Sequence, residues 1–430
     1  MGSRMNRSNK AVIIAPFWGD PQHIGTHRIR QFLRWLASAR VEVVLVRAGR
    51  TDRQRQEDWG TEITVRDPLG LHSDSETGSP LDYRFVQTRR PNPLRRWAAY
   101  FLLNPDPTVI WARAAASHPI VLKFAQNASW VLSSSPPETA HVGSFLLAKH
   151  LKTDLIVDMR DGWLDEPLRP RNKSIPFQQW REEQWEARIL RNAKQVLVTS
   201  SVWRQLLEER LPFTRGKVRV LTNMYPETSA RLEVEDWMPN EEGLLNLVYA
   251  GRFTGSRTTR KADRLLDPLL TGLQSNPSHG QIRFVGNLAS EDLAQIDQYR
   301  PRFEEAGWSL ACHPSVSRDE LGRQLSRADG LLLLTVGYAT VPLKFYDYLP
   351  ARRPILAVSP RGSAMSQIGE NLRQVFLLDT EANDDGLLRI REFLRACREP
   401  SIRYEVPSQF QQSELAKVFF DALEIRSLIC

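Results

Sequence analysis

The sequence predicts an α/β protein built from two domains, each with a parallel sheet between layers of helices. Short runs of apolar and β-branched residues alternate with longer segments of helical period along the 430 residues. Such alternation is typical of parallel strands connected by helices. The pattern restarts near Leu244, and a chain of this length exceeds what one hydrophobic core usually organises.

The predicted strands are short apolar runs, which suits burial on both faces of a sheet. They are Ala11–Phe17, Val41–Ala48, Trp130–Ser134, Asp154–Asp158, Gln195–Thr199 and Val218–Leu221 in the first half, and Leu245–Ala250, Ile282–Val285, Trp308–His313, Gly330–Thr335, Pro354–Val358 and Val375–Leu378 in the second. The clearest helical segments are Ile29–Ser38, Phe177–Arg191, Ala262–Leu273, Glu291–Phe303 and Asp385–Cys397.

A polar, acidic and proline-containing interval separates the two series of strands. We therefore predict an N-terminal domain over 1–225, a linker over 226–243 and a C-terminal domain over 244–430. Whether the last helix packs back onto the N-terminal domain is left open.

Composition narrows the classes of function. The chain is 41% hydrophobic and 25% charged, as in globular proteins, and no apolar run approaches the roughly 18 residues that span a bilayer. Cys312, Cys397 and Cys430 lie far apart without metal-ligand spacing, which predicts free thiols in the cytoplasm. The net charge of +8 is spread in small groups, which favours a solvated surface; a patch facing the inner side of the membrane is the alternative.

Polar residues follow three predicted strands of the first half, where ligands of parallel sheets bind. Gly25 precedes a helix without the dinucleotide fingerprint; it lets backbone amides approach a phosphate, or it belongs to a plain turn. His141 opens a later helix and is either structural or catalytic. Asp158, Arg160 and Asp161 end a buried strand, where they either form an ion pair that fixes the loop or bind a polar acceptor.

Basic residues follow the first strand of the second half. Gly251 lets the backbone turn closely, and Arg252 with Lys261 could hold a diphosphate, with bidentate geometry from the arginine. Arg257 and Arg260 compete with Lys261 for this role, and a solvated basic loop is the alternative.

A second polar segment in this half follows the strand Gly330–Thr335. Pro342 suits the first turn of a helix, and this helix would carry Lys344 and Asp347. A carboxylate there can accept hydrogen bonds from two ribose hydroxyls, although a helical aspartate is more often simply solvated.

Taken in order, these segments resemble the retaining glycosyltransferases of family four, which have the GT-B architecture of two Rossmann-like, doubly wound domains facing across a cleft. The resemblance covers nearly the whole chain. The segments that carry it are Gly25–Arg28, Pro105–Trp111, Ser134–His141, Asp158–Trp163, Gly251–Lys261 and Pro342–Leu349.

The resemblance implies roles for single residues. The residues implied at the donor are Gly25, Gly251, Arg252, Lys261, Lys344 and Asp347, those implied in catalysis are Arg252, Lys261, His141 and Asp161, and those implied at the acceptor are Arg28, Arg160 and Asp161. The family's paired glutamates fall at Ala339, which is not acidic, and at Asp347, which is one methylene shorter.

The implied reaction moves a sugar from a UDP- or GDP-type nucleotide-sugar to a hydroxyl of a saccharide, lipid-linked or small-molecule acceptor. It retains the anomeric configuration and belongs to bacterial polysaccharide or glycoconjugate assembly. Arg252 and Lys261 would stabilise the leaving diphosphate, and no convincing Asp-x-Asp pair is present, so we expect no metal and no cofactor. We expect a cytoplasmic enzyme without a nucleic-acid partner, and peripheral contact with the inner face of the membrane is the alternative.

Two alternatives stay open. One is a catalytically inactive GT-B scaffold, which Ala339 favours. The other is a sugar-nucleotide epimerase of similar fold.

Overall fold

The structure is a computed structural model that describes residues 9–19, 24–70, 103–106, 108–165, 176–225, 243–253, 262–276, 278–380, 385–399 and 404–425. It divides into two compact units. The N-terminal unit contains Met1–Thr199, Trp203–Thr222 and Leu415–Cys430, and the C-terminal unit contains Ser200–Val202 and Asn223–Glu414. Most of the predicted linker lies outside the described residues, so its bounds stay a prediction.

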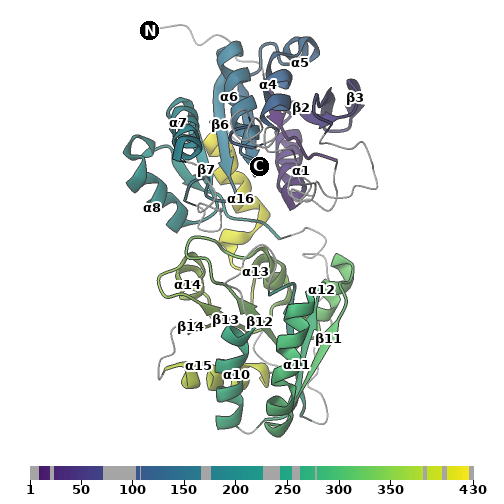
Figure 1. The fold of residues 1–430 in the computed structure, drawn as a ribbon, viewed down its shortest axis with the longest axis vertical. Coiled ribbons are helices and arrows are strands. Elements are labelled where there is room, and N and C mark those ends of the chain that lie inside the picture. The colour runs from purple at the N-terminus through teal and green to yellow at the C-terminus, as the bar shows by residue number, and fades with distance from the viewer. Residues whose placement is uncertain are drawn as a thin grey trace. The chain divides into compact units, whose positions relative to one another are not determined.

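The N-terminal unit is built on an eight-stranded sheet with the order β3-β4-β2-β1-β5-β6-β7-β8. Figure 1 labels β2, β3, β6 and β7 of this sheet. The strands are β1 (Lys10–Ile14), β2 (Glu42–Gly49), β3 (Arg53–Glu57), β4 (Gly60–Arg66), β5 (Trp130–Ser135), β6 (Asp154–Met159), β7 (Gln195–Val198) and β8 (Val218–Val220). All neighbouring pairs are parallel except β3 with β4. Val12 lies between Val44 and Val131 in register, and all three are fully buried.

Sequence patterning missed the β3–β4 pair. β3 is Arg-Gln-Arg-Gln-Glu, so it has no apolar alternation, and its side chains are mostly exposed. It is an edge strand held by backbone pairing to β4, and charged side chains on an edge discourage pairing with other chains.

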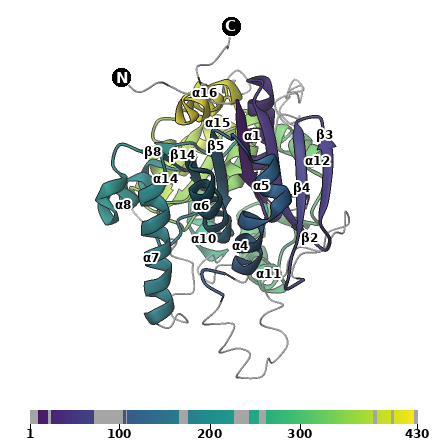
Figure 2. The ribbon, with the colours of Figure 1, turned by 90° about the horizontal axis from the view of Figure 1, so that it is seen from above.

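Helices cover both faces of this sheet, because the connections that leave β1 in opposite directions place them on opposite sides. They are α1 (Ile24–Ser38), α4 (Val109–Ser117), α5 (Pro119–Phe124), α6 (Thr139–Leu151), α7 (Pro176–Asn192), α8 (Ser201–Arg210) and α16 (Gln412–Leu423). Figure 2 shows α1 and α16 on one side of the strands and α4 and α6 on the other. Phe419 of α16 stacks on Phe32 of α1 with ring centres 4.6 Å apart.

The C-terminal unit is built on a parallel six-stranded sheet with the order β11-β10-β9-β12-β13-β14. Its strands are β9 (Leu245–Ala250), β10 (Gly280–Val285), β11 (Trp308–His313), β12 (Gly330–Leu334), β13 (Ile355–Ser359) and β14 (Val375–Asp379). Its helices are α10 (Asp263–Ser275), α11 (Ser290–Glu305), α12 (Arg318–Ser326), α13 (Leu343–Tyr348), α14 (Ala364–Gly369) and α15 (Asp385–Cys397). The predicted fold class, two α/β domains with parallel sheets, is therefore confirmed.

Each sheet has one point at which the strand order reverses. In the N-terminal unit the chain leaves β1 for β2 and later returns to the other side of β1 as β5. In the C-terminal unit it leaves β9 for β10 and returns beside β9 as β12. Connections diverge at such points, which opens a crevice at the carboxyl ends of the strands, and ligands of this fold class bind there.

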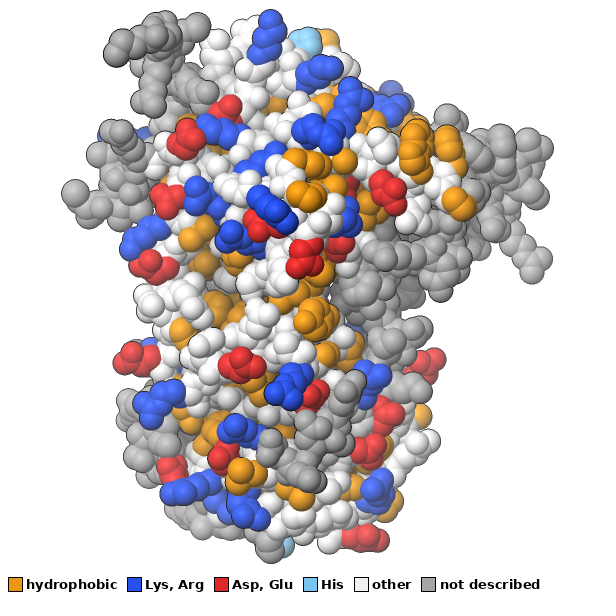
Figure 3. Space-filling model, turned by 90° about the vertical axis from the view of Figure 1, so that its left-hand side faces the viewer, with side chains coloured by type: hydrophobic (Ala, Val, Ile, Leu, Met, Phe, Trp, Pro, Cys, Tyr) orange, Lys and Arg blue, Asp and Glu red, His pale blue; other side chains and the backbone are white. Residues whose placement is uncertain are grey.

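The charged surface is mixed. On the face shown in Figure 3, Lys and Arg side chains are interspersed with Asp and Glu side chains. Exposed ion pairs such as Arg204–Glu208 and Arg323–Glu320 are of the kind that contributes little to stability.

Candidate functional site

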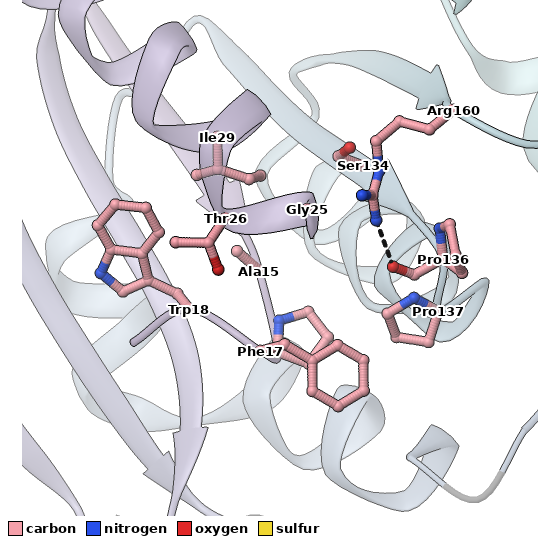
Figure 4. Close-up of a pocket in the computed structure, with 11 residues that line it drawn as sticks. Ala15, Phe17, Trp18, Gly25, Thr26, Ile29, Ser134, Pro136, Pro137 and Arg160 are labelled. Carbon is pink, nitrogen blue, oxygen red and sulfur yellow. Dashed lines mark hydrogen bonds between the residues drawn. The ribbon is translucent and has the colours of Figure 1, made fainter. Parts of the chain in front are cut away.

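A pocket lies at the reversal point of the N-terminal sheet (Figure 4). It is lined by the segment after β1, by the first turns of α1, by the end of β5 and by Arg160, which follows β6. Phe17 and Trp18 supply aromatic surface, and Figure 4 shows Trp18 and Arg160 on opposite sides. The sequence-based site did not include Phe17 and Trp18, although their position directly after the first strand was the available signal.

Trp18 is held in place by polar contacts. Its indole N–H donates a hydrogen bond to Glu62 Oε2 at 2.8 Å, and Trp59 meets it edge-on with ring centres 5.9 Å apart. Glu62 is only 8% exposed and lies 3.6 Å from the guanidinium of Arg47. The aromatic wall is therefore fixed before any ligand arrives.

Arg160 forms the polar side of the pocket. Its Nε donates to the carbonyl of Ser135 and its Nη2 to the carbonyl of Pro136, both at 2.7 Å. The residue is 9% exposed, and burial lowers its pKa, while the nearby Asp161 and Asp158 oppose that shift.

Gly25 lies directly against Arg160. A Cβ atom at Gly25 would stand 2.7 Å from Nη1 of Arg160, closer than real Cβ contacts, so this guanidinium position requires a glycine. The structure thus brings together two residues that the sequence assigned separately, Gly25 to the donor and Arg160 to the acceptor.

Arg28, predicted to bind the acceptor, is occupied inside the fold. Its Nε and Nη2 donate to the carboxylate of Asp158, with a shortest N–O distance of 2.6 Å. Nη1 and Nη2 also donate to the carbonyls of Thr222 and Leu221, both at 2.9 Å. Ser134 Oγ donates to the same carboxylate at 2.6 Å. Asp158 therefore forms an ion pair, which was one of the two alternatives for the residues after β6. Its partner is Arg28 and not Arg160.

His141, predicted to be catalytic, is fully buried at the start of α6 and is not among the residues that line the pocket. Its Nδ1 shares a hydrogen bond with Ser133 Oγ at 2.7 Å. Burial lowers its pKa to about 3, with Asp158 opposing the shift. The imidazole is therefore neutral at pH 7. Asp161 is partly exposed at the end of β6.

A second group of residues meets at the reversal point of the C-terminal sheet, where β9 and β12 lie side by side. The Tyr348 hydroxyl of α13 accepts a hydrogen bond from the N–H of Ala250 at 2.8 Å and donates to the carbonyl of Leu332 at 3.1 Å. One side chain thus ties α13 to both strands, and it explains why Tyr348 is fully buried.

Lys344 reaches the carboxyl end of β9 from the same helix. Its Nζ donates to the carbonyl of Ala250 at 3.0 Å and lies 3.7 Å from the centre of the Tyr249 ring. Gly251 follows with φ +89, a conformation that favours glycine, and a Cβ there would come 3.9 Å from Nζ. The ammonium group of Lys344 therefore lies next to Gly251 at the carboxyl end of β9. The roles predicted for these two residues stay predictions.

Asp347 lies one helical turn beyond Lys344 on α13. Burial raises the pKa of its carboxyl to about 6, with the charge of Arg318 opposing the shift. Arg252 is exposed just after β9. Lys261 and its competitors Arg257 and Arg260 lie outside the described residues, so their contribution stays a prediction.

Within the described parts of the chain, no three His, Cys, Asp or Glu side chains are grouped so that they could hold a metal ion. In the same parts, none of the helices is both long enough and apolar enough to cross a membrane.

Comparisons with known proteins agree with this architecture. Residues 25–224 match the glycosyl transferase 4-like domain. The sucrose-phosphate synthase of Thermosynechococcus elongatus aligns over 97% of this chain and 96% of its own, with 14% identity and a TM-score of 0.58. A glycosyltransferase from Rickettsia africae aligns over 99% and 100%, with 12% identity and a TM-score of 0.55. Anabaena HepE in complex with UDP aligns over 96% and 99%, with 9% identity and a TM-score of 0.53.

At these identities the solved structures show the fold alone, and a search of curated protein sequences finds no match for this chain. A glycosyl transferase domain covers the N-terminal half, and the two-domain fold agrees over almost the whole chain. Residues 25–224 therefore form a glycosyl transferase domain, and the whole chain has the two-domain GT-B fold.

Proposed function

We propose that this enzyme moves a sugar from a UDP-sugar bound by the C-terminal unit to a hydroxyl of an acceptor bound by the N-terminal unit. The observation that carries the proposal is the cluster at the β9–β12 reversal point. There, Gly251 and Lys344 supply an open backbone and a cation, and Asp347 supplies a carboxylate one helical turn beyond Lys344. A backbone that can approach closely and a cation suit a diphosphate, and a carboxylate can accept hydrogen bonds from ribose hydroxyls.

The diphosphate is assigned to the carboxyl end of β9. An ammonium group is a compact point charge that suits phosphate oxygens, and Lys344 already lies at this end of the strand. Arg252 follows on the exposed surface, and Lys261 is proposed to join it. Positioned cations stabilise a diphosphate as it departs with negative charge, so the proposed reaction needs no metal ion.

The ribose is assigned to Asp347. A carboxyl group whose pKa is raised by burial lacks donors that stabilise its ionised form. Two ribose hydroxyls would supply such donors. The UDP complex of Anabaena HepE, a protein of the same fold, supports a uridine nucleotide over the GDP alternative.

Retention of the anomeric configuration, membership of family four and a place in bacterial polysaccharide or glycoconjugate assembly are proposed from the ordered motifs described under Sequence analysis. Asp161, partly exposed at the end of β6, is the proposed contact to the acceptor and the transferring sugar. His141 is neutral and enclosed, so it is proposed to support the acceptor pocket through Ser133 rather than to exchange a proton.

A thermal-shift panel of UDP, GDP, ADP and dTDP, each with and without Mg²⁺, tests the donor site. A ligand at a hundredfold excess over its Kd stabilises its binding unit by about 2.7 kcal/mol. We expect UDP to shift wild type without metal and to shift Arg252→Ala much less. Arg395→Ala is the matched control, because it removes another exposed arginine of the same unit, whose ion pair within the described residues is with Glu399.

Two outcomes would contradict the proposal. If no nucleotide stabilises wild type, the cluster does not bind a donor and the scaffold alternative gains. If Arg395→Ala lowers the shift as much as Arg252→Ala does, the effect comes from general surface charge rather than from this site.

A further inference from the structure

The buried charges around the N-terminal pocket do not balance in pairs. Arg28 and Arg160 are both at least nine-tenths buried, and Asp158 is the buried carboxylate of this region. Asp158 is bound by Arg28 and Ser134. Within the described residues no carboxylate forms an ion pair with Arg160; Asp161, Asp158 and Glu138 act on it only from a longer distance.

Arg160 hydrogen-bonds to two neutral carbonyl groups, which accept from Nε and Nη2 but not from Nη1. Nε and Nη2 donate to Ser135 and Pro136, which fixes the plane of the group. Nη1 lies over Gly25, where the missing side chain leaves space, and Figure 4 shows the guanidinium beside Gly25 in the pocket. A fixed guanidinium with one uncommitted edge is suited to a planar or tetrahedral oxyanion.

The opposite wall is aromatic. Trp18, fixed by Glu62, and Phe17 line the same pocket. Aromatic rings pack well against the apolar C–H faces of sugars, while Ser134 lies on the polar side next to Arg160. The pocket thus combines a ring-stacking surface with one buried cation.

We propose that this pocket binds a sugar that carries an oxyanion, a phosphate or a carboxylate, with the anion on Arg160 and the ring against Trp18 and Phe17. This inference rests on the proposed function, because it assigns that anionic sugar as the acceptor. The same oxyanion chemistry is present in the diphosphate of the donor, so the experiment must separate the two sources.

The test measures Kd values on the full chain by calorimetry. The probes are glucose, galactose and mannose, their 6-phosphates, their uronic acids and UDP. A hydrogen bond to a charged group is worth about 1.5–3 kcal/mol, so we expect at least one anionic sugar to bind wild type about tenfold or more tightly than its neutral parent.

Two variants assign the effect to Arg160. Arg160→Gln removes the charge and retains an amide donor for a backbone carbonyl. Gly25→Ala retains every polar group but places a methyl 2.7 Å from Nη1, which displaces the guanidinium from its present position. Alanine is a better helix former than glycine, so Gly25→Ala decides the question if Arg160→Gln does not fold. In both, we expect the preference for the anionic sugar to disappear. In Arg160→Gln we expect the Kd of UDP to stay within about twofold of wild type.

The outcomes are distinguishable. If no anionic sugar binds wild type more tightly than its parent, or if both folded variants retain the preference, the inference is overturned. It is also overturned if the variants weaken UDP and leave the anionic sugar unchanged, because the oxyanion then belongs to the donor. If UDP fails to bind wild type while the anionic sugar binds and depends on Arg160, the proposed transfer reaction fails but the pocket assignment stands.

Discussion

Replacing Asp347 by asparagine should stabilise the protein without ligand and weaken the binding of nucleotide. Asp347 is half-buried on α13, and desolvation of its carboxyl group raises the pKa from the ordinary 3.8 to about 6. At pH 7.5 the folded protein must therefore hold an ionised group in surroundings that favour the neutral form.

The size of the effect follows from the pKa. Between pH 3.8 and about 6 the folded state binds more protons at Asp347 than the unfolded state, so stability falls as the pH rises through this window. Each pKa unit corresponds to about 1.4 kcal/mol, which gives at most roughly 3 kcal/mol of destabilisation above pH 6. An asparagine side chain cannot ionise, so Asp347→Asn should match wild type near pH 3.5 and be more stable at pH 7.5.

Ligand binding should change in the opposite direction. Ribose hydroxyls that donate to the carboxylate stabilise its ionised form, and hydrogen bonds to a charged group contribute about 1.5–3 kcal/mol. Asp347→Asn should therefore weaken binding by about tenfold to a hundredfold at pH 7.5. In wild type the affinity should rise between pH 5 and 7 as the carboxyl ionises, with a midpoint near 6.

The assay is chemical unfolding and UDP-glucose titration of wild type and variant over this pH range. UDP-glucose is preferred to UDP because a terminal phosphate itself titrates near pH ~6. Asp297→Asn, which removes an exposed carboxylate of the same unit, is the control and should show neither effect. If Asp347→Asn is less stable than wild type at pH 7.5, or binds UDP-glucose equally well, the reasoning is wrong.

Four further predictions concern stability and protonation. Asp158→Asn should destabilise the N-terminal unit by about 3–5 kcal/mol in urea unfolding, because it leaves the buried charge of Arg28 without its partner. His141, with a pKa near 3, should give the nitrogen NMR signals of a neutral imidazole down to pH 5; a midpoint near 6 would contradict its burial. Its folded pKa lies below the unfolded value of 6.5, so its contribution to stability is complete above pH 6.5 and falls by up to about 1.4 kcal/mol per pH unit below it. Phe419→Ala should cost about 3–5 kcal/mol in unfolding of the N-terminal unit, since the ring is fully buried and stacked on α1. Gly251→Ala should cost about 1–2 kcal/mol at its φ of +89, measured against the unfolding of the C-terminal unit.

The sequence predicted the regular part of this fold well, and the reason is physical. A parallel strand buried on both faces has to be apolar and short, so Leu245–Ala250 and Trp308–His313 were predicted with the bounds that the structure gives. Helices with one apolar face gave an equally direct signal, and Asp385–Cys397 has its predicted bounds. β3 was not predicted from its apolar pattern, because an edge strand is stabilised by backbone pairing and needs no apolar side chain.

The candidate sites were predictable only in part. Strand ends drew attention to the right loops, because the carboxyl ends of parallel strands must meet at one edge. Patterns along the chain do not, however, reveal which loops are neighbours. Trp18 belongs to the pocket because Glu62, 44 residues further along the chain, orients its indole. Tyr348 matters because it bridges Ala250 and Leu332.

Arg28 and Arg160 show most clearly what sequence reasoning lacked. Both are basic residues in predicted ligand-binding loops, and both were assigned to the acceptor. In the structure Asp158 forms an ion pair with Arg28 and not with Arg160. The distance from Arg28 Nη2 to Asp158 Oδ1 is 2.6 Å. A guanidinium paired with a carboxylate inside the fold has little reason to bind a ligand. Arg160 is also buried, but it hydrogen-bonds to carbonyls, and the carboxylates of Asp161, Asp158 and Glu138 act on its charge without forming an ion pair with it. The role of a buried arginine can therefore be inferred only once its neighbours are known, and those neighbours are why Arg28 is assigned to the fold and Arg160 is proposed to bind a ligand.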